Sequence, residues 1–181
     1  RIRGEEHADL GLEIERRVAQ VLGIETERVT QVIQTCVWEG YPESFRPGDL
    51  LEGYPALFAA IDARGWPRAI VSDHPSFRKL ERMEIETGWQ AIVDCSGMGA
   101  LKPLPDGLTR AAEAMGTAPG DVVLIGDRQS TDGGMAEASG ARFLLRGRDW
   151  HMPADLWEPL GLVADPPQDS EGRGAHEHTE R

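Results

Sequence analysis

The sequence predicts an α/β protein in which helices cover both faces of a parallel sheet, preceded by a mainly helical segment. Two observations support this fold class. Four short apolar runs, each bounded by polar or turn residues, lie at positions 69–71, 91–93, 122–125 and 143–145. Helical patterns lie between them, and strands that are continuously apolar and alternate with helices are typical of a parallel sheet buried on both sides.

The first part of the chain predicts helices. Apolar residues recur at helical spacing over 10–24 and again over 29–37, with Thr26 as the expected N-cap of the second helix. Val32 and Cys36 are expected on the apolar face of that helix. The many β-branched residues make a strand the alternative, but the helical period favours a helix. Residues 41–53 carry prolines and glycines and are expected to connect it to a third helix, from about Pro55 to Gly65.

Three more helices are expected between the apolar runs. Phe77, Leu80 and Met83 share one helical face, and a second helix runs from about Pro105 to Gly116. A third, short helix over 131–139 ends at Gly140, a residue type that favours a helix C-terminus. Residues 165–181 are charged and lack large apolar side chains, so we expect them to be disordered.

Composition narrows the function classes. The chain of 181 residues has 31 acidic and 19 basic residues, a net charge of -12 that repels phosphate backbones and argues against nucleic-acid binding. No apolar run approaches the roughly 20 residues of a membrane span. Two cysteines suit a reducing cytosol, so a cytoplasmic location is expected. Only two of the basic residues are lysines, Lys79 and Lys102.

Polar side chains follow the apolar runs, where ligands of open α/β sheets bind. Ser72 and Asp73 follow the first run, Lys102 lies in a loop after the second, and Asp127 and Asp132 follow the third. A hydroxyl and an ammonium suit a phosphate group, and two carboxylates suit Mg²⁺. The sequence therefore predicts a site for a phosphorylated ligand and a divalent cation.

Three of these segments resemble motifs of the haloacid dehalogenase-like (HAD) hydrolases. The segment 69–75 (AIVSDHP) resembles their second motif, 99–105 (GALKPLP) their third, and 123–132 (VLIGDRQSTD), continuing to Gly140, their fourth. Each motif is weak alone, but they occur in the family's order, on the expected elements, over about residues 50–147. The resemblance implies a HAD-like Rossmannoid sheet with a small helical cap.

The resemblance also implies a chemistry. Phosphatases of the family attack phosphorus with an aspartate, which forms an aspartyl-phosphate that water hydrolyses. By position, Ser72 would bind the phosphoryl group, Lys102 would neutralise charge as the second catalytic residue, and Asp73 would contact substrate. Asp127, and Asp132 directly or through water, would bind Mg²⁺. The expected substrate is a small phosphorylated metabolite; the sequence does not indicate the oligomeric state.

One family motif has no counterpart. The Asp-x-Asp that supplies the nucleophile after an apolar strand does not occur in this sequence. Because that strand precedes the cap in the family, we expect a chain that begins just after it. The expected organisation is a cap segment over 1–50, an α/β core over 51–164 without its first strand, and the tail over 165–181.

Alternatives remain for function and for single residues. A non-catalytic relative that binds a ligand or partner would explain the missing nucleophile, and a metal-independent dehalogenase would use related chemistry, although the two aspartates favour the metal-dependent branch. Asp73, His74 and Arg128 are either site residues or ordinary loop residues. We expect Cys95 to be a buried packing residue, and His176 and His178 to be tail residues without a metal.

Overall fold

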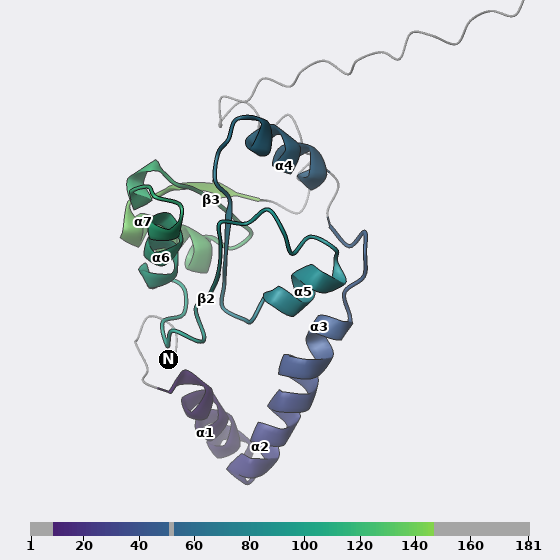
Figure 1. Ribbon diagram of the computed structural model, residues 1–181. Coiled ribbons are helices and arrows are strands. Elements are labelled where there is room, and N and C mark those ends of the chain that lie inside the picture. The colour runs from purple at the N-terminus through teal and green to yellow at the C-terminus, as the bar shows by residue number, and fades with distance from the viewer. Residues whose placement is uncertain (1–8, 51–52, 147–181) are drawn as a thin grey trace, which may run out of the picture.

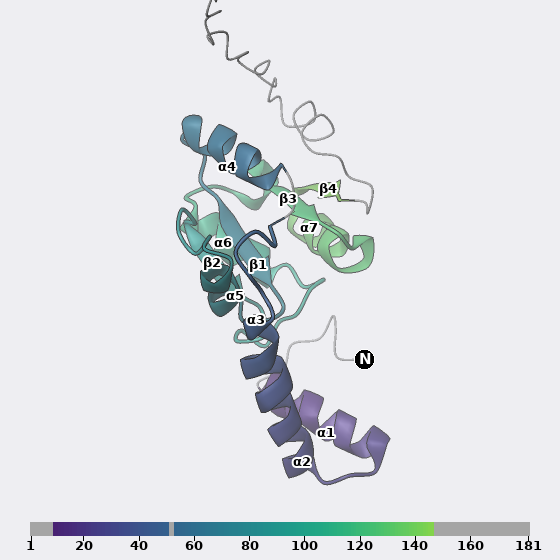
Figure 2. The ribbon, with the colours of Figure 1, turned by 90° about the vertical axis from the view of Figure 1, so that its right-hand side faces the viewer.

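The computed structural model describes residues 9–50 and 53–146 of the chain. The first of these segments forms an arm of helices: α1 (Leu10–Leu22), α2 (Thr26–Val32), the π-helix η1 (Ile33–Gly40) and α3 (Tyr41–Glu43). Figures 1 and 2 show that this arm projects from the part of the molecule that holds the strands. The predicted helical segment is therefore confirmed, although its division into separate domains stays a prediction.

The arm differs from the sequence-based expectation in two details. Asp9 caps α1 by accepting a hydrogen bond from the Leu12 amide at 2.9 Å, whereas the N-cap of α2 is Glu25 and Thr26 is its first helical residue. The predicted apolar face of the second helix is also wrong at Val32, which is 54% exposed, and at Cys36, which is exposed. A π-helix has more residues per turn than an α-helix, so the 3.6-residue period does not continue through η1.

The remaining elements alternate between helices and strands. They run in the order α4 (Tyr54–Ala63), β1 (Ala69–Ser72), α5 (Phe77–Arg82), β2 (Ala91–Asp94), α6 (Asp106–Ala114), the 3₁₀ turn η2 (Pro119–Asp121), β3 (Val123–Gly126), the π-turn η3 (Gln129–Gly133), α7 (Gly134–Ser139) and β4 (Arg142–Leu145). Each of the four apolar runs is thus a strand. The predicted helix closed by Gly140 is η3 followed by α7, and Gly140 takes a left-handed φ of 78° at its end.

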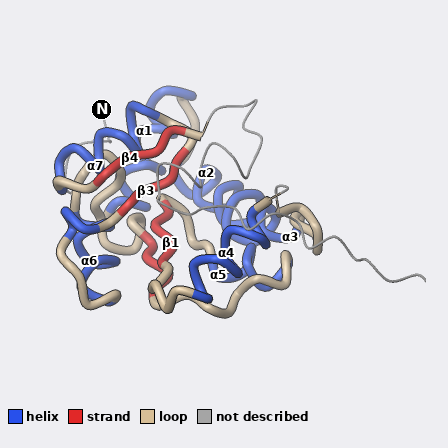
Figure 3. Tube along the Cα trace, turned by 90° about the horizontal axis from the view of Figure 1, so that it is seen from above, coloured by secondary structure: helices blue, strands red, loops and turns tan. Residues whose placement is uncertain are grey.

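The four strands form two separate parallel pairs. In one pair Ala69 of β1 lies opposite Ala91 of β2, and in the other Val123 of β3 lies opposite Arg142 of β4. Within the described residues β1 and β3 do not pair with each other. Figure 3 shows the two pairs from above, with β1 and β3 at the centre of the molecule.

Helices pack on both sides of these strands. Figures 1 and 3 show α6 and α7 on one side of β1 and β3, and α4 and α5 on the other. The largest fully buried side chains are those of Leu57, Leu108, Met135 and Cys95, contributed by α4, α6, α7 and the end of β2. Leu80 is buried as expected, but Phe77 is 55% exposed, so the predicted face of that helix is wrong at its first residue.

Helix α6 approaches the first strand pair closely at a glycine. A Cβ atom on Gly107 would lie 2.5 Å from the Cys95 Sγ atom and 2.9 Å from a methyl group of Val71.

The first helix of the arm also contacts the core. Leu10 of α1 packs with Cys95 and Leu101 in one buried cluster, so the arm begins against the core. Among the described residues, none of the helices has both the length and the apolar character that crossing a bilayer requires. The predicted tail lies outside the described residues.

Candidate active site

The carboxyl end of β1 turns sharply after Ser72. The Ser72 Oγ atom accepts a hydrogen bond from the His74 amide at 3.1 Å, and the buried Ser76 hydroxyl donates to the His74 carbonyl at 3.1 Å. Such serine-to-backbone bonds favour a turn over continued strand. On the neighbouring strand the Cys95 amide donates to the Ser72 carbonyl at 2.8 Å. The turn therefore places Ser72, Asp73 and His74 together at the strand end.

Lys102 connects this turn to the other strand pair. Its backbone amide donates to the Asp73 Oδ1 atom at 3.0 Å, and its ammonium lies 2.7 Å from the Asp132 Oδ1 atom. The Lys102 and Asp132 side chains are only 15% and 7% exposed. An ion pair with so little solvent around it is much less screened than one on the surface. The structure thus brings together Asp73, Lys102 and Asp132, three of the five predicted site residues.

Asp132 is held on its second oxygen as well. The Arg128 amide donates to the Asp132 Oδ2 atom at 3.1 Å, within the π-turn η3 that follows β3. Gly126, the last residue of β3, makes room for this carboxylate: a Cβ atom there would lie 2.5 to 2.6 Å from three atoms of the Asp132 side chain. The glycine of the fourth motif is therefore required by the close approach of Asp132 to the strand.

Asp127 has a different environment from Asp132. It is exposed, and the structure gives it no direct contact with Asp132 among the described residues. Its carboxylate lies close enough to Tyr54 of α4 to affect that phenol: burial raises the pKa of Tyr54, the Arg146 guanidinium opposes this shift, and the Asp127 carboxylate adds to it. The two predicted metal ligands thus lie at the start and near the end of the segment that follows β3, and their side chains do not contact each other among the described residues.

The donor set fits Mg²⁺ only in part. Carboxylate oxygens are the ligands that Mg²⁺ prefers, and the ion keeps several waters when a protein offers one or two of them. Asp127 offers an exposed carboxylate, whereas both oxygens of Asp132 are already hydrogen-bonded. Within the described ranges no group of three or more acidic, histidine or cysteine side chains gathers around one point. The Asp127 carboxylate is therefore more available to a cation than the Asp132 carboxylate.

The two cysteines differ in their exposure to solvent. Cys36 on the arm is exposed, whereas Cys95 is 1% exposed and packs against Leu10 and Leu101. Burial raises the pKa of Cys95 to about 11, with the Asp73 carboxylate adding to the shift and the Lys102 ammonium opposing it. A nucleophilic thiol needs a lowered pKa. Cys95 is therefore a packing residue, as expected.

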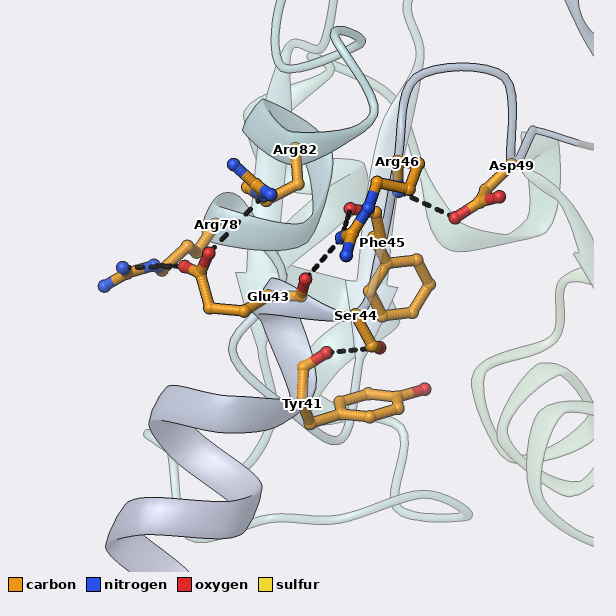
Figure 4. Close-up of polar contacts among 8 residues, drawn as sticks. All are labelled: Tyr41, Glu43, Ser44, Phe45, Arg46, Asp49, Arg78 and Arg82. Atoms are coloured by element: carbon orange, nitrogen blue, oxygen red, sulfur yellow. Dashed lines mark hydrogen bonds and ion pairs between the residues drawn. The ribbon is translucent and has the colours of Figure 1, made fainter.

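The junction between the arm and α5 holds residues that the sequence motifs do not include. Figure 4 shows Glu43 of α3 between two arginines of α5, with oxygens 2.7 Å from Arg78 and 3.5 Å from Arg82. Beside it the rings of Tyr41 and Phe45 pack edge to face, with centroids 5.2 Å apart. Lys79 of α5 faces these rings. The scarcity of lysine in the chain was the only sequence signal for Lys79.

Comparison with known proteins decides the family. The family model for haloacid dehalogenase-like hydrolases matches residues 5–140. The chain belongs to this family. The resemblance based on the three motifs is thereby confirmed.

Among curated relatives, the phosphoglycolate phosphatase of Escherichia coli K12 is 27% identical over 142 residues, which cover 75% of this chain and 56% of the relative. The phosphoglycolate phosphatase of Shigella boydii gives the same identity and coverage. The chain thus spans about half the length of the curated relatives that it matches.

Solved structures agree on the fold. A β-phosphoglucomutase from Clostridium difficile has a TM-score of 0.65 at 14% identity, and covers 84% of this chain and 67% of its own. A HAD family hydrolase from Deinococcus radiodurans R1, solved with bound phosphate and sodium, has a TM-score of 0.50 at 27% identity, over 78% of this chain and 61% of its own. The predicted α/β HAD-like fold is therefore confirmed.

Proposed function

We propose that the protein is a Mg²⁺-dependent phosphatase that hydrolyses a small phosphorylated metabolite through an aspartyl-phosphate. One observation carries the proposal: Lys102 is held at the carboxyl ends of the strands at two points. Its ammonium donates to Asp132, and its backbone amide donates to the Asp73 carboxylate. A fixed cation at this edge stabilises the charge that develops on a transferred phosphoryl group.

Each described residue has a defined part in this proposal. Lys102 neutralises charge on the phosphoryl oxygens, and Asp132 holds the Lys102 ammonium in place. The Ser72 hydroxyl, which already accepts the His74 amide, still has its proton to donate to a phosphoryl oxygen. Asp73 accepts a hydrogen bond from the Lys102 backbone amide, so it orients the Lys102 loop beside the substrate that it would contact.

Asp127 would hold the metal ion, with Asp132 acting through water. When bound, Mg²⁺ would supply positive charge opposite the transferred phosphoryl group. Support comes from the exposed carboxylate of Asp127 beside the strand end and from the bound phosphate and sodium of the Deinococcus relative.

The proposal places the nucleophile on a segment outside Arg1–Arg181, because the sequence contains no Asp-x-Asp. The arrangement of strands supports this placement. β1 and β3, which end at Ser72 and Gly126, belong to different pairs among the described residues. A further strand between them would present its last residues to Lys102 and would satisfy backbone groups on both sides.

Hydrolysis of p-nitrophenyl phosphate by the full-length gene product, with and without Mg²⁺, tests the proposal. We expect turnover that requires Mg²⁺ and disappears in Lys102→Ala. The 181-residue chain alone should give no turnover, and restoring roughly 20–30 upstream residues, enough for a strand and its loop, should restore it. Absence of hydrolysis by the full-length protein towards small phosphate esters would contradict the proposal and favour a non-catalytic relative.

A further inference from the structure

Both lysines of the chain lie in the same region of the structure. Lys102 is in the active-site loop, and Lys79 is on α5, the helix that follows the Ser72 turn. Burial lowers the pKa of Lys79, and the Lys102 ammonium lowers it further. All other basic residues are arginines, which carry a larger, planar group. Two compact ammonium groups are thus placed near each other at the site.

Lys79 lies where the helical arm meets the core. Its Nζ atom is 5.9 Å from the ring centroid of Tyr41 and 5.9 Å from that of Phe45. An ammonium at this distance is attracted to the electron-rich ring faces. The two rings therefore hold the ammonium at the arm end of the site without neutralising its charge.

The charges around Lys79 do not balance. Glu43, the nearby acid of the arm, forms ion pairs with Arg78 and Arg82, which lie on either side of Lys79 in the sequence (Figure 4). Within residues 9–50 and 53–146, Lys79 itself forms no ion pair. Partial burial of a cation without an anion, beside a second cation, costs free energy that a bound anion would recover.

We propose that Lys79 is a specificity-determining residue that binds a second anionic group on the leaving-group side of the substrate. The phosphoryl group would lie at Lys102, and a carboxylate or second phosphate of the same small molecule would lie at Lys79, below the Tyr41 and Phe45 rings. This inference rests on the proposed phosphatase function. It narrows the substrate class from any small phosphate ester to one with anionic groups at both ends.

Three esters of similar length test this inference with the full-length gene product. 2-Phosphoglycolate carries a carboxylate, the bisphosphate of ethylene glycol carries a second phosphate, and ethyl phosphate carries a methyl group at that end. We expect the wild type to prefer one or both of the first two over ethyl phosphate, and the preferred one identifies the anionic group. Lys79→Met should lower kcat/KM for the preferred ester about 10- to 100-fold, mainly through KM, the scale of one charged contact.

Two further variants separate specificity from structure. Ethyl phosphate hydrolysis by Lys79→Met should fall by no more than about threefold, and Lys79→Arg should keep part of the preference because it keeps the charge. Arg110→Met, which removes a cation from the exposed side of α6, should change none of the three activities.

Two results would overturn the inference while leaving the phosphatase function standing. One is a wild type that hydrolyses all three esters equally well. The other is a Lys79→Met variant that loses the same factor towards each ester. Failure of the wild type to hydrolyse any ester, p-nitrophenyl phosphate included, would instead overturn the proposed function and this inference with it.

Discussion

The Lys102 ammonium lies 2.7 Å from the Asp132 carboxylate and so connects the two strand pairs, which share no strand pairing within the described part of the chain. Lys102 follows the β1–β2 unit, and Asp132 follows β3. Because both side chains are largely shielded from water, removing either one would leave the charge of the other without its partner. The contact therefore links the two strand pairs, in addition to the part in catalysis that we propose for Lys102.

Asp132→Asn should lower the free energy of unfolding by about 3 kcal/mol, because it leaves a shielded ammonium without its anion. The double variant Lys102→Met with Asp132→Asn removes that ammonium too and should lose less than the single variant. Urea denaturation of the three proteins measures this difference. Equal losses in the single and double variants would show that the ion pair is not the cause.

Gly126→Ala should destabilise the protein by about 1–3 kcal/mol, because the added Cβ atom meets the Asp132 side chain at 2.5 to 2.6 Å. The matched control is Gly120→Ala, where the nearest atom to an added Cβ is 3.8 Å away. That change should stay within about 0.5 kcal/mol of the wild type. Thermal unfolding of both variants tests the close approach; equal midpoints would argue against it.

Mg²⁺ should raise the melting temperature by mass action, and Asp127→Asn should abolish that shift. Asp121→Asn provides the control, since Asp121 is another exposed aspartate and lies before β3. The control protein should keep the full shift. A Mg²⁺ response in Asp127→Asn as large as that of the wild type would remove Asp127 from the metal site.

Lys102→Arg should reduce kcat of the full-length protein at least about 100-fold, the scale of losing one stabilising donor. Arginine keeps the charge, but its planar group is too large to take the position between Asp132 and a phosphoryl oxygen that we propose for the compact ammonium. Steady-state kinetics with p-nitrophenyl phosphate measure the effect. Near-normal turnover would mean that charge alone suffices at this position.

The two thiols should react with an aromatic disulfide reagent at very different rates at pH 8. Cys36 is exposed and should react at once, whereas Cys95 is buried, has a pKa of about 11, and should react only on unfolding. Cys36→Ser should remove the fast phase. The raised pKa of Cys95 also makes the stability of the fold depend on pH. The neutral thiol contributes fully to the free energy of unfolding below about pH 9, and this contribution is lost as the pH rises towards 11.

Much of the fold is predictable because its signals are local. The four apolar strands, the helix stop at Gly140 and the order Ser72, Lys102, Asp127 are all visible in short stretches of sequence. The predicted partnership of Asp127 and Asp132 is less complete, because sequence spacing does not show that Lys102 and the Arg128 amide already occupy both oxygens of Asp132.

The misses have physical causes as well. The π-helical course of η1 changes which residues share a face, so an α-helical period misplaces Cys36. Val32, the last residue of α2, is exposed directly before it. The role of Lys79 depends on rings that are more than 30 positions away in the sequence and on an acid, Glu43, that neutralises its neighbours instead. No local pattern carries that information.

The two strand pairs also bear on how the chain acquires its structure. In each pair the partners are close in sequence, since Ala69 meets Ala91 and Val123 meets Arg142, so each unit closes only a short loop as it forms. Helix α6 contacts β1, β2 and α7, and so joins the two units. We therefore expect two cooperative units whose amide protons exchange with solvent at distinct rates, with docking of α6 as the step that unites them.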